Sequence, residues 1–478
     1  MAWDVQDTMR LGSLRLRNFR RFSDFSIDFD PKMTVIVGDN GSGKTALLDA
    51  AAVALGATLT KIDGASRRNI TLEDVRQESE SHGSRYVSVE HYPVEISAVG
   101  TAEGVSCDWQ RAKKSHNGRT SDTGGMTVYA EHWNEVGRHG KTADTAMLPL
   151  IAYYGSDRLH GGKRLRQDPQ WMKRFAGYWE CLDTKINLTE FTEWMKQISW
   201  SEYEDRSEGE TTVAPELTVI KEAARQCLKG LTGRGDTDVF YSPKQQQVIV
   251  RYSNETGGIV QLPFSWMSSG YVSVLGIVMD IAHRMVNLNI DTTREPLNVL
   301  CTPGVVLIDE VDLHLHPKWQ ERVLEDLQHV FPNIQFIVTT HAPVVVASVK
   351  QREQLRMLRE GDNGRLHVDM PGSEVYGQTS ARILEQVMGA NDVRADVKTT
   401  IEEIDDALDD DEFDDARSKL RQLLEVVGPE NAEYERLHTA LEFMTPLEAG
   451  ESDGASEDAP EDAEESDDTG DGVDDAVR

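Results

Sequence analysis

One eight-residue segment constrains the fold of this chain more than any other: Gly38-Asp-Asn-Gly-Ser-Gly-Lys-Thr45. It follows an apolar run, Met33–Val37, and precedes an Ala- and Leu-rich segment that predicts a helix over Thr45–Leu55. A glycine-rich turn between a buried strand and a helix lets successive backbone N–H groups surround a phosphate at the positive end of the helix. Lys44 can then reach the β- and γ-phosphates of a nucleotide, and the Thr45 hydroxyl can bind Mg²⁺. The segment therefore predicts a nucleotide-binding α/β domain. The expected phosphate-binding residues are Gly38, Asn40, Gly41, Ser42, Gly43, Lys44 and Thr45.

A second segment, Val305-Val-Leu-Ile-Asp309-Glu310, is an apolar strand that ends in two acids. In a protein with a phosphate-binding loop, the first acid holds the Mg²⁺ shell and the second can activate water. The alternative is a strand followed by a solvated turn, and the upstream loop makes that alternative much weaker. We expect Asp309 to be a metal ligand and Glu310 a catalytic residue. A Glu directly after the Asp also favours hydrolysis over nucleotide binding alone.

Three weaker signals lie near these motifs. His341 follows a buried run, Phe336–Thr340, and could contact the γ-phosphate, although such a histidine taken alone is more often structural. Ser268, Ser269 and Gly270 precede an apolar helix, where they are either an ordinary N-cap or a second place to hold a phosphate. His314 and His316 have no Cys or Glu at ligand spacing, so a structural role is favoured over a metal site.

The charge of the chain limits its partners. With 50 Lys and Arg against 82 Asp and Glu, the net charge is −32 over 478 residues, which excludes a protein that is basic all over its surface. The segment Arg158–Arg174 carries a net charge of +5 and is either a DNA-contacting patch or a solvated loop. Four scattered cysteines predict reduced thiols. The most apolar stretch, Tyr271–Val286, contains Asp280, His283 and Arg284, so we expect no membrane span and a cytoplasmic protein.

Composition and periodicity divide the chain into six expected regions. Two apolar stripes, over Phe413–Val427 and Tyr434–Met444, predict a hairpin of two helices. The tail from Glu451 holds 13 acids and one Arg, a composition typical of disorder. The regions are 1–58, a lobe with the phosphate loop; 59–146, an inserted β-rich accessory region; 147–236, a strand plus a helical insertion; 237–370, a second lobe with the acids and His341; 371–446, a helical region; and 447–478, a disordered acidic tail.

Taken together, these motifs resemble the SMC/RecF-like branch of the ABC ATPases. Leu14–Phe22 is similar to the opening strand of that branch, Gly38–Thr45 to its phosphate loop, and Asp309–Pro317 to its fused Walker B and D-loop. Ser268–Tyr271 stands at the place of the signature motif, with Ser269 and Tyr271 where glycine and glutamine are commonest, and His341 matches the switch histidine. The motifs occur in the family's order over about residues 10–350, but the Q-loop glutamine is not placed.

Within this branch, the chain is more similar to Septu-type anti-phage ATPases, including those attached to some retrons. The segments that carry this narrower resemblance are Ile151–Gly155 with Arg158, Trp266–Met285, Tyr376–Ser380, Ile383–Glu385 and Phe413–Val427.

The resemblance implies an α/β ATPase head that binds ATP and Mg²⁺ and forms a homodimer or higher homo-oligomer, head to tail. Each ATP would lie between Gly38–Thr45 of one subunit and Ser268–Gly270 of the other. Glu310 would orient or deprotonate the attacking water, and His341 would sense the γ-phosphate.

The expected function is that of an ATP-hydrolysing subunit of a bacterial or archaeal anti-phage complex that controls a separately encoded effector nuclease. The alternative is a RecF-like DNA-repair ATPase. The long insertion between Lys44 and Ser268 disfavours an ABC transporter subunit. A self-contained nuclease of the OLD type would need a Toprim domain after His341, and the remaining residues indicate only helices and a tail. The helices within Ala395–Met444 are expected to dock a partner protein.

Overall fold

The structure is a computed structural model that describes residues 9–82, 85–139, 147–159, 174–207, 214–233, 236–253, 256–361, 364–390 and 394–445. The chain divides into two compact units, Met1–Asp392 and Val393–Arg478, called here the head and the helical unit. Of the expected regions, the acidic tail 447–478 lies outside the described residues, as does most of the basic segment Arg158–Arg174.

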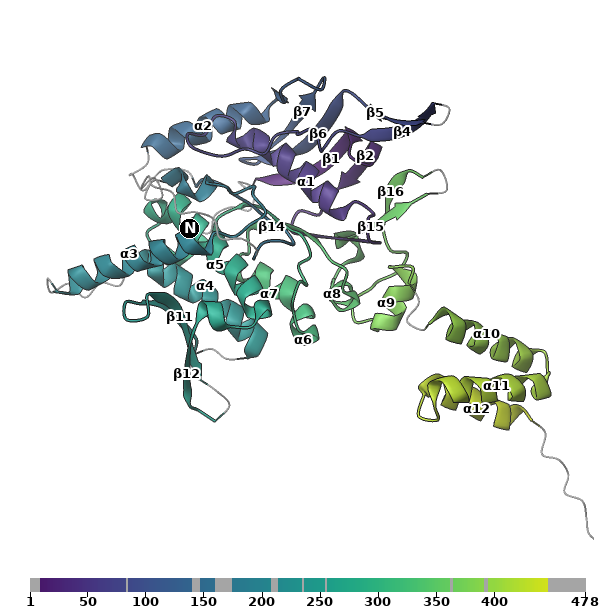
Figure 1. The fold of residues 1–478 in the computed structure, drawn as a ribbon. Helices are drawn as coiled ribbons and strands as arrows, with labels where there is room; N and C mark the ends of the chain where they lie inside the picture. The colour runs from purple at the N-terminus through teal and green to yellow at the C-terminus, as the bar shows by residue number, and fades with distance from the viewer. Residues whose placement is uncertain are drawn as a thin grey trace, which may run out of the picture. The chain divides into compact units, whose positions relative to one another are not determined.

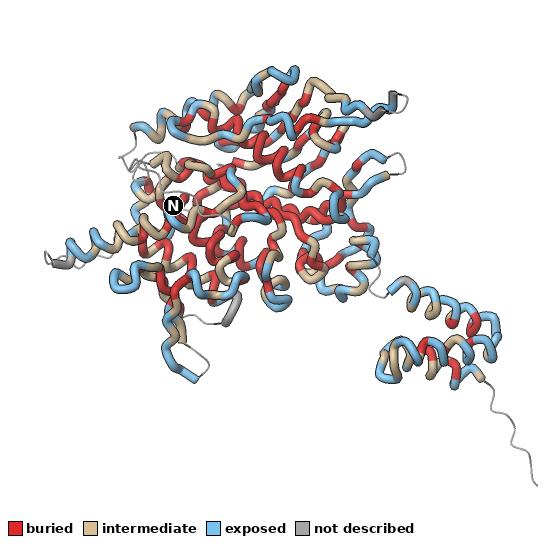
Figure 2. Tube along the Cα trace, viewed as in Figure 1, coloured by how far each residue is buried: buried red, intermediate tan, exposed pale blue. Residues whose placement is uncertain are grey.

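The head is built around a six-stranded sheet, whose strands are buried at its centre (Figure 2). Its strands are β3 (Met33–Gly38), β9 (Leu150–Tyr154), β13 (Gly304–Ile308), β14 (Ile334–Thr339), β15 (Leu355–Glu360) and β16 (Leu366–Asp369). The order is β16-β15-β3-β14-β13-β9, and all neighbours are parallel except the pair β15 and β16. Strands β9, β13 and β14 are buried along their whole length, which explains their continuous apolar sequence.

A second, antiparallel sheet lies across helix α1 (Lys44–Leu55) from the first (Figure 1). Its strands, in the order β2-β1-β6-β7-β8, are β1 (Arg10–Phe19), β2 (Phe22–Asp28), β6 (Val94–Ala102), β7 (Val105–Lys113) and β8 (Ser121–Gly124). Helix α1 packs against both sheets, and its side chains from Ala46 to Leu55 are all buried. Strand β6 pairs with β1, so the strands of the expected accessory region 59–146 extend the sheet that begins with β1 and β2.

The opposite side of the six-stranded sheet carries the long apolar helix α5 (Ser269–Asn289), which packs against α4 (Pro215–Thr232) and β9. Beside them lies a small antiparallel sheet of β10 (Asp238–Ser242), β11 (Gln247–Ser253) and β12 (Ile259–Pro263). By length and composition alone, Ser269–Thr292 is the one candidate membrane span in the described part of the chain. Since 83% of its apolar window is buried inside the head, it has the surroundings of a core helix.

The remaining elements of the head surround these layers (Figure 1). The helices are α2 (Met126–His139), α3 (Leu188–Ser207), α6 (Pro317–Gln320), α7 (Val323–Val330), α8 (Pro343–Ala347) and α9 (Ser380–Gln386). A hairpin is formed by β4 (Gln77–His82) and β5 (Arg85–Glu90). Short 3₁₀ helices are η2 (Gly56–Leu59), η4 (Arg174–Tyr178), η5 (Phe264–Trp266), η6 (Ile290–Thr292), η7 (Pro296–Cys301) and η8 (Arg352–Gln354).

The helical unit holds three helices where the sequence analysis expects a hairpin of two. They are α10 (Ala395–Asp409), α11 (Phe413–Val427) and α12 (Ala432–Met444). Their apolar stripes bury one another in a core that contains Ile404, Leu420, Leu423, Leu437 and Leu441. Because this third helix completes a core, the stripes need no partner protein to cover them, and the reason for expecting a docking surface there does not hold.

Candidate nucleotide site

Four loops with polar side chains meet at one edge of the six-stranded sheet. The phosphate loop follows β3, Thr340 and His341 follow β14, Asp309 and Glu310 follow β13, and Gly155–Arg158 follows β9. Because these four strands are parallel neighbours, their carboxyl ends share an edge, which is where open α/β sheets bind ligands.

The phosphate loop has a backbone that requires glycine. Gly41 and Gly43 have φ values of 78° and 100°, in the left-handed region. A Cβ at Gly38 would lie 2.6 Å from the Leu358 carbonyl oxygen and 2.8 Å from Ser42 Oγ, so no side chain fits there. The Ser42 hydroxyl is buried and has no hydrogen-bond partner among the described residues. A buried hydroxyl without a partner in such a loop fits a site that takes a phosphate oxygen.

Lys44 points back into its own loop. Its Nζ atom donates to the carbonyl oxygens of Gly38 at 2.7 Å and Asp39 at 2.9 Å. Burial lowers the pKa of the Lys44 ammonium, an effect opposed by the nearby Asp309 carboxylate. A phosphate would give this partly desolvated cation a charged partner, so the residue is poised for an anionic ligand.

Asp309 joins two segments that are far apart in sequence. Its Oδ2 accepts a hydrogen bond from Thr45 Oγ1 at 2.8 Å, and its Oδ1 accepts one from Thr339 Oγ1 at 2.6 Å. The two expected metal ligands, Thr45 and Asp309, therefore lie together. One hydroxyl and one carboxylate fit Mg²⁺, which binds few protein oxygens and takes the rest of its shell from phosphate and water. No group of three or more His, Cys, Asp or Glu in the described ranges could hold a metal by itself.

Glu310 has an unusual backbone. Its φ of 49° is left-handed, which is uncommon for a residue other than glycine. Its N–H donates to Thr339 Oγ1 at 2.8 Å, and its carbonyl accepts from Arg158 Nη2 at 3.0 Å. The side chain is half-buried, at the edge where the phosphate loop and Asp309 meet. A sparsely populated backbone conformation held on both sides is typical of functional sites.

His341 is half-buried and directly follows Thr340 at the end of β14, between the strands that lead to the phosphate loop and to the acids. Thr340 Oγ1 donates to Asp312 Oδ1 at 2.6 Å and accepts from the Ala342 N–H at 3.0 Å. These bonds hold the turn that carries His341.

Ser268, Ser269 and Gly270 begin helix α5. Ser268 is at the N-cap position, but its side chain accepts no hydrogen bond from the helix, so it does not act as an ordinary N-cap. Ser268 and Ser269 are exposed, while Gly270 is buried. A Cβ at Gly270 would lie 2.6 Å from the His314 carbonyl oxygen, so a glycine is needed there. Within the described head, these residues and the phosphate loop belong to different loops, and no hydrogen bond joins them.

The histidines of the H-x-H pair take structural positions. His316 is the N-cap of α6, where its Nδ1 accepts from the Lys318 N–H at 3.3 Å. His314 is exposed and has a left-handed backbone with a φ of 64°.

Arg158 and Arg174, the two ends of the basic segment, form hydrogen bonds within the protein. Arg158 is 1% exposed and donates to main-chain carbonyls at the nucleotide edge. Arg174 is half-buried and donates to the carbonyl of Leu288 at 2.5 Å. Both guanidinium groups are therefore engaged by the protein itself, so neither of them supports the DNA-contacting alternative. The residues between them, 160–173, lie outside the described part.

Sequence reasoning missed three contributors to this edge. The sequence analysis expects Arg158 in a DNA-contacting patch or a solvated loop, and it gives Thr339 no role beyond the buried run Phe336–Thr340. Arg21 lies within Leu14–Phe22, the segment similar to the opening strand of the family, and its Nη1 donates to the carbonyl of Gly41 in the phosphate loop. Two consecutive threonines after a buried strand were a usable signal for Thr339, whereas nothing local distinguishes Arg158 from the other basic residues around it.

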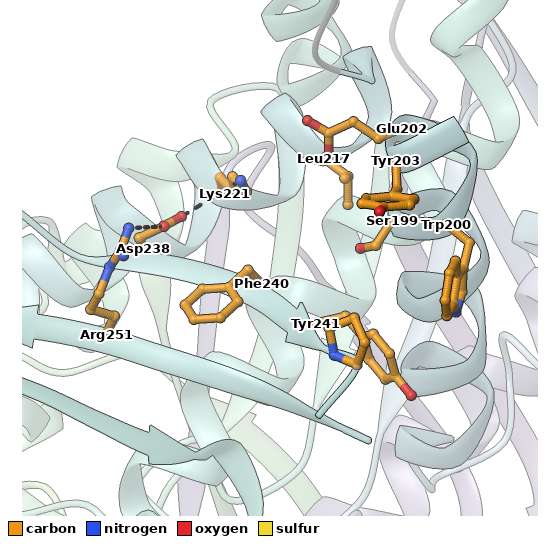
Figure 3. A pocket seen from close by; sticks show the side chains of 11 residues that line it. Ser199, Trp200, Glu202, Tyr203, Leu217, Lys221, Asp238, Phe240, Tyr241 and Arg251 are labelled. Atoms are coloured by element: carbon orange, nitrogen blue, oxygen red, sulfur yellow. Dashed lines mark hydrogen bonds and ion pairs between the residues drawn. The ribbon is translucent and has the colours of Figure 1, made fainter. Parts of the chain in front are cut away.

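A second hollow lies away from this edge, between α3, α4 and the β10–β11 pair. Figure 3 shows its aromatic walls, Trp200, Tyr203, Phe240 and Tyr241, and an ion cluster at one end. Its volume is about 580 Å³. In the cluster, Asp238 pairs with Arg251 at 2.6 Å and with Lys221 at 3.7 Å. Since the carboxylate already pairs with both cations, this hollow lacks the free cation and the glycine loop that phosphate binding requires.

Comparisons with known proteins agree with the geometry. A family model described as "AAA domain" matches residues 13–232, and one described as "AAA domain, putative AbiEii toxin, Type IV TA system" matches residues 193–347. "Retron Vc95 probable ATPase" of Vibrio cholerae serotype O1 biovar El Tor is 26% identical over 418 residues, which are 79% of this chain and 78% of that protein. "Septu protein PtuA" of Bacillus thuringiensis is 29% identical over 204 residues, 41% of this chain and 49% of that protein. The chain is an ATPase that resembles the SMC/RecF-like ABC ATPases and is similar to the retron and Septu ATPases.

The broad and the narrow resemblance seen in the sequence of this ATPase are both confirmed. Among solved structures, the SMC head domain from Thermotoga maritima aligns with a TM-score of 0.40 at 16% identity, over 76% of this chain and 99% of that one. The α/β class is confirmed by the parallel sheet and by the family model that spans the phosphate loop.

Proposed function

We propose that this ATPase hydrolyses ATP with Mg²⁺ at composite sites formed by two copies of the head, and that it acts in the cytoplasm as part of an anti-phage complex. The observation that carries the catalytic part is the 2.8 Å hydrogen bond between Thr45 and Asp309, which joins the two motifs across the shared sheet edge. The bound Mg²⁺ would neutralise charge on the phosphates, held by Thr45 and Asp309.

In this proposal the phosphate loop and Lys44 bind the phosphates. Glu310 orients the attacking water and takes up its proton, and His341 contacts the γ-phosphate. Asn40 and Gly41 are exposed on the outer side of the loop, where a second protein copy can reach them.

The second copy supplies Ser268, Ser269 and Gly270 to each site. Two observations support this role: the two serines are exposed, and the Ser268 hydroxyl does not cap its own helix. A hydroxyl beside a helix N-terminus suits a phosphate oxygen. The nucleotide would thereby link the two heads, and hydrolysis would release them.

The complex also contains a separately encoded effector nuclease, which the ATP state of the heads restrains or releases. The relation to retron and Septu ATPases supports this part of the proposal. Both described ends of the segment Arg158–Arg174 bond to carbonyls of the protein itself, so these two residues lend no support to the RecF-like DNA-repair alternative.

A mixing experiment tests the composite site. Gly270 is a poor target because any side chain there would strike the His314 carbonyl within the same head. Ser269→Arg, at an exposed position, should instead block assembly across two heads while leaving ATP affinity of the single head unchanged. Mixing Ser269→Arg with Lys44→Ala subunits should restore part of the activity, because one of the two sites in a mixed dimer is complete.

The matched control is Ser265→Arg, an exposed serine on the preceding 3₁₀ helix, which should leave activity unchanged. A verified mixed dimer without any recovered hydrolysis would contradict the shared site. For the defence role, cells that express this chain with its neighbouring genes should resist phage, and Glu310→Gln should remove the resistance.

A further inference from the structure

Arg158 is a fully buried cation that contacts two consecutive residues of the nucleotide edge and one residue of helix α5. It follows β9 and is 1% exposed. Its Nη1 donates to the carbonyl of Asp309 at 2.8 Å, and its Nη2 donates to the carbonyl of Glu310 at 3.0 Å. On its other side, Nε donates to Ser273 Oγ at 2.9 Å. One guanidinium group therefore joins the main chain of both acids to helix α5.

Arg158 bonds to the main chain of Glu310, a residue with an uncommon backbone conformation. Glu310 is left-handed, and such a residue relaxes toward an ordinary conformation unless its surroundings prevent it. Thr339 holds its N–H and Arg158 holds its carbonyl, so both polar groups of the Glu310 main chain are fixed. The direction of the Glu310 side chain follows from that backbone conformation.

Ser273 extends the connection to the signature segment. It is 0% exposed and lies one helical turn after Ser269 on α5. Residues four apart on a helix share a face, so the exposed Ser269 and the buried Ser273 lie on the same side of the first turns. A shift of the start of α5 would therefore move the hydroxyl to which Arg158 Nε donates.

We propose that Arg158 is a positioning residue that holds Glu310 in its left-handed conformation and couples it, through Ser273, to the first turns of α5. The coupling rests on the proposed function, in which Ser268–Gly270 bind ATP on the opposite head. Contact with that ATP would fix the position of the first turns of α5. Through Ser273, α5 would then fix the position of the Arg158 guanidinium, which in turn holds the backbone that directs the Glu310 carboxylate.

The chemistry requires arginine at this position. A guanidinium is planar and presents separate N–H donors in fixed directions, so it can bond two consecutive carbonyls and a hydroxyl at once. A lysine ammonium is a single compact donor on a flexible chain and cannot span the same three acceptors. Burial lowers the pKa of Arg158 to about 10, which still leaves it charged at neutral pH.

The first test is the steady-state kinetics of the full chain. Arg158→Lys keeps the charge and most of the volume, and it should lower kcat by about 10- to 100-fold, as expected for a misplaced catalytic group. Ser273→Ala, which removes one hydroxyl, should lower kcat by about threefold, the equivalent of one weak hydrogen bond. Neither variant should change ATP affinity, because Arg158 and Ser273 do not touch the phosphate loop.

Arg111→Lys is the matched structural control. Arg111 is also 0% exposed, and its guanidinium also bonds main-chain carbonyls and a carboxylate, but near the C-terminal end of α1. It should lower the melting temperature by a similar amount and leave kcat unchanged. Equal loss of kcat in Arg111→Lys and Arg158→Lys would overturn the positioning role, as would a kcat of Arg158→Lys within about twofold of wild type.

A second measurement does not depend on hydrolysis. Amide hydrogen exchange in the peptide that contains Glu310 and Val311 should be faster in Arg158→Lys than in wild type, and unchanged in Arg111→Lys. Unchanged exchange in Arg158→Lys would overturn the proposal that Arg158 holds the backbone of Glu310. If wild type fails to hydrolyse ATP, the proposed function fails, and the exchange result still decides whether Arg158 holds Glu310.

Discussion

The nucleotide edge of the head and the helical unit are built in opposite ways. At the nucleotide edge, Thr45 and Asp309 are 264 residues apart and touch through short polar contacts. In the helical unit, three consecutive helices bury one another's apolar stripes, and all contacts are local in sequence. The first arrangement needs the whole sheet to bring its parts together, whereas the second depends only on periodicity and short connections.

The two regions also use charge differently. The described residues 394–445 hold 16 acids and 6 bases, and these lie mostly on exposed faces. At the nucleotide edge, in contrast, Lys44, Arg158 and Asp309 are buried, and each makes at least two hydrogen bonds. Removing one partner of a buried, hydrogen-bonded charge destabilises a protein strongly, because the other partner is left buried and unpaired. Exposed ion pairs contribute little to the free energy of unfolding. Function is therefore expected to depend on the first region and solubility on the second.

The largest expected effect comes from the nucleotide edge. Lys44→Ala should lower ATP affinity by about 100-fold, because it removes one partner of a buried charged contact. Titration of the full chain with a fluorescent ATP analogue measures this directly. Arg421→Ala, an exposed cation of α11, is the control and should leave affinity unchanged. Equal affinity of Lys44→Ala and wild type would remove the basis for the assigned phosphate site.

A large effect on stability, confined to the other region, is expected from Leu437→Ala. Leu437 is 0% exposed in the core of the helical unit, so the truncation should destabilise that unit by about 2–5 kcal/mol. The melting of the helical unit should move to lower temperature, and the ATPase rate should stay the same. A fall in rate that follows the loss of stability would show that the two regions are coupled.

A smaller effect concerns pH and only the head. His283 on α5 packs against Trp194 with ring centroids 4.5 Å apart, and burial lowers its pKa from 6.5 to about 4. Below pH 6.5 His283 is protonated in the unfolded chain but stays neutral in the folded head. The free energy of unfolding is therefore unaffected by His283 above pH 6.5 and decreases as the pH falls toward 4.

Between pH 7 and pH 5 this loss should amount to about 2 kcal/mol. Denaturant titrations at both pH values measure it, with His283→Gln as the comparison, since the variant should lose less stability over the same range. An equal loss in wild type and His283→Gln would contradict the assignment.

The smallest effect is expected from removing the helical unit. A chain that ends at Ala390 keeps every described residue of the nucleotide edge, so its ATPase rate should stay within about twofold of wild type, as for independent sites. Steady-state turnover of both chains, at equal subunit concentration, checks this. A fall in the ATPase rate of more than about twofold would mean that the helical unit contributes to assembly of the active heads.

Much of this protein could be read from its sequence. Gly38–Thr45 and Asp309–Glu310 identified the nucleotide edge, because phosphate binding demands glycines and acids at fixed places beside apolar strands. Helices α11 and α12 followed from their apolar periodicity. Helix α10 carries the same kind of stripe, with Val397, Ile401, Ile404 and Leu408 at three- and four-residue steps, and its place in the core was readable but missed.

Only the tertiary structure decided the surroundings of the acids. Arg158 stands in a basic segment, and its local sequence does not distinguish a surface cation from a buried one. Its role depends on β9 pairing with β13 and on α5 packing against β9, contacts between residues more than one hundred positions apart. Local patterns report periodicity and chain conformation, but a buried polar contact between distant segments exists only once the sheet order is set. The glycine loop could therefore be predicted from the sequence, whereas the contact of Arg158 with the main chain of Glu310 could not.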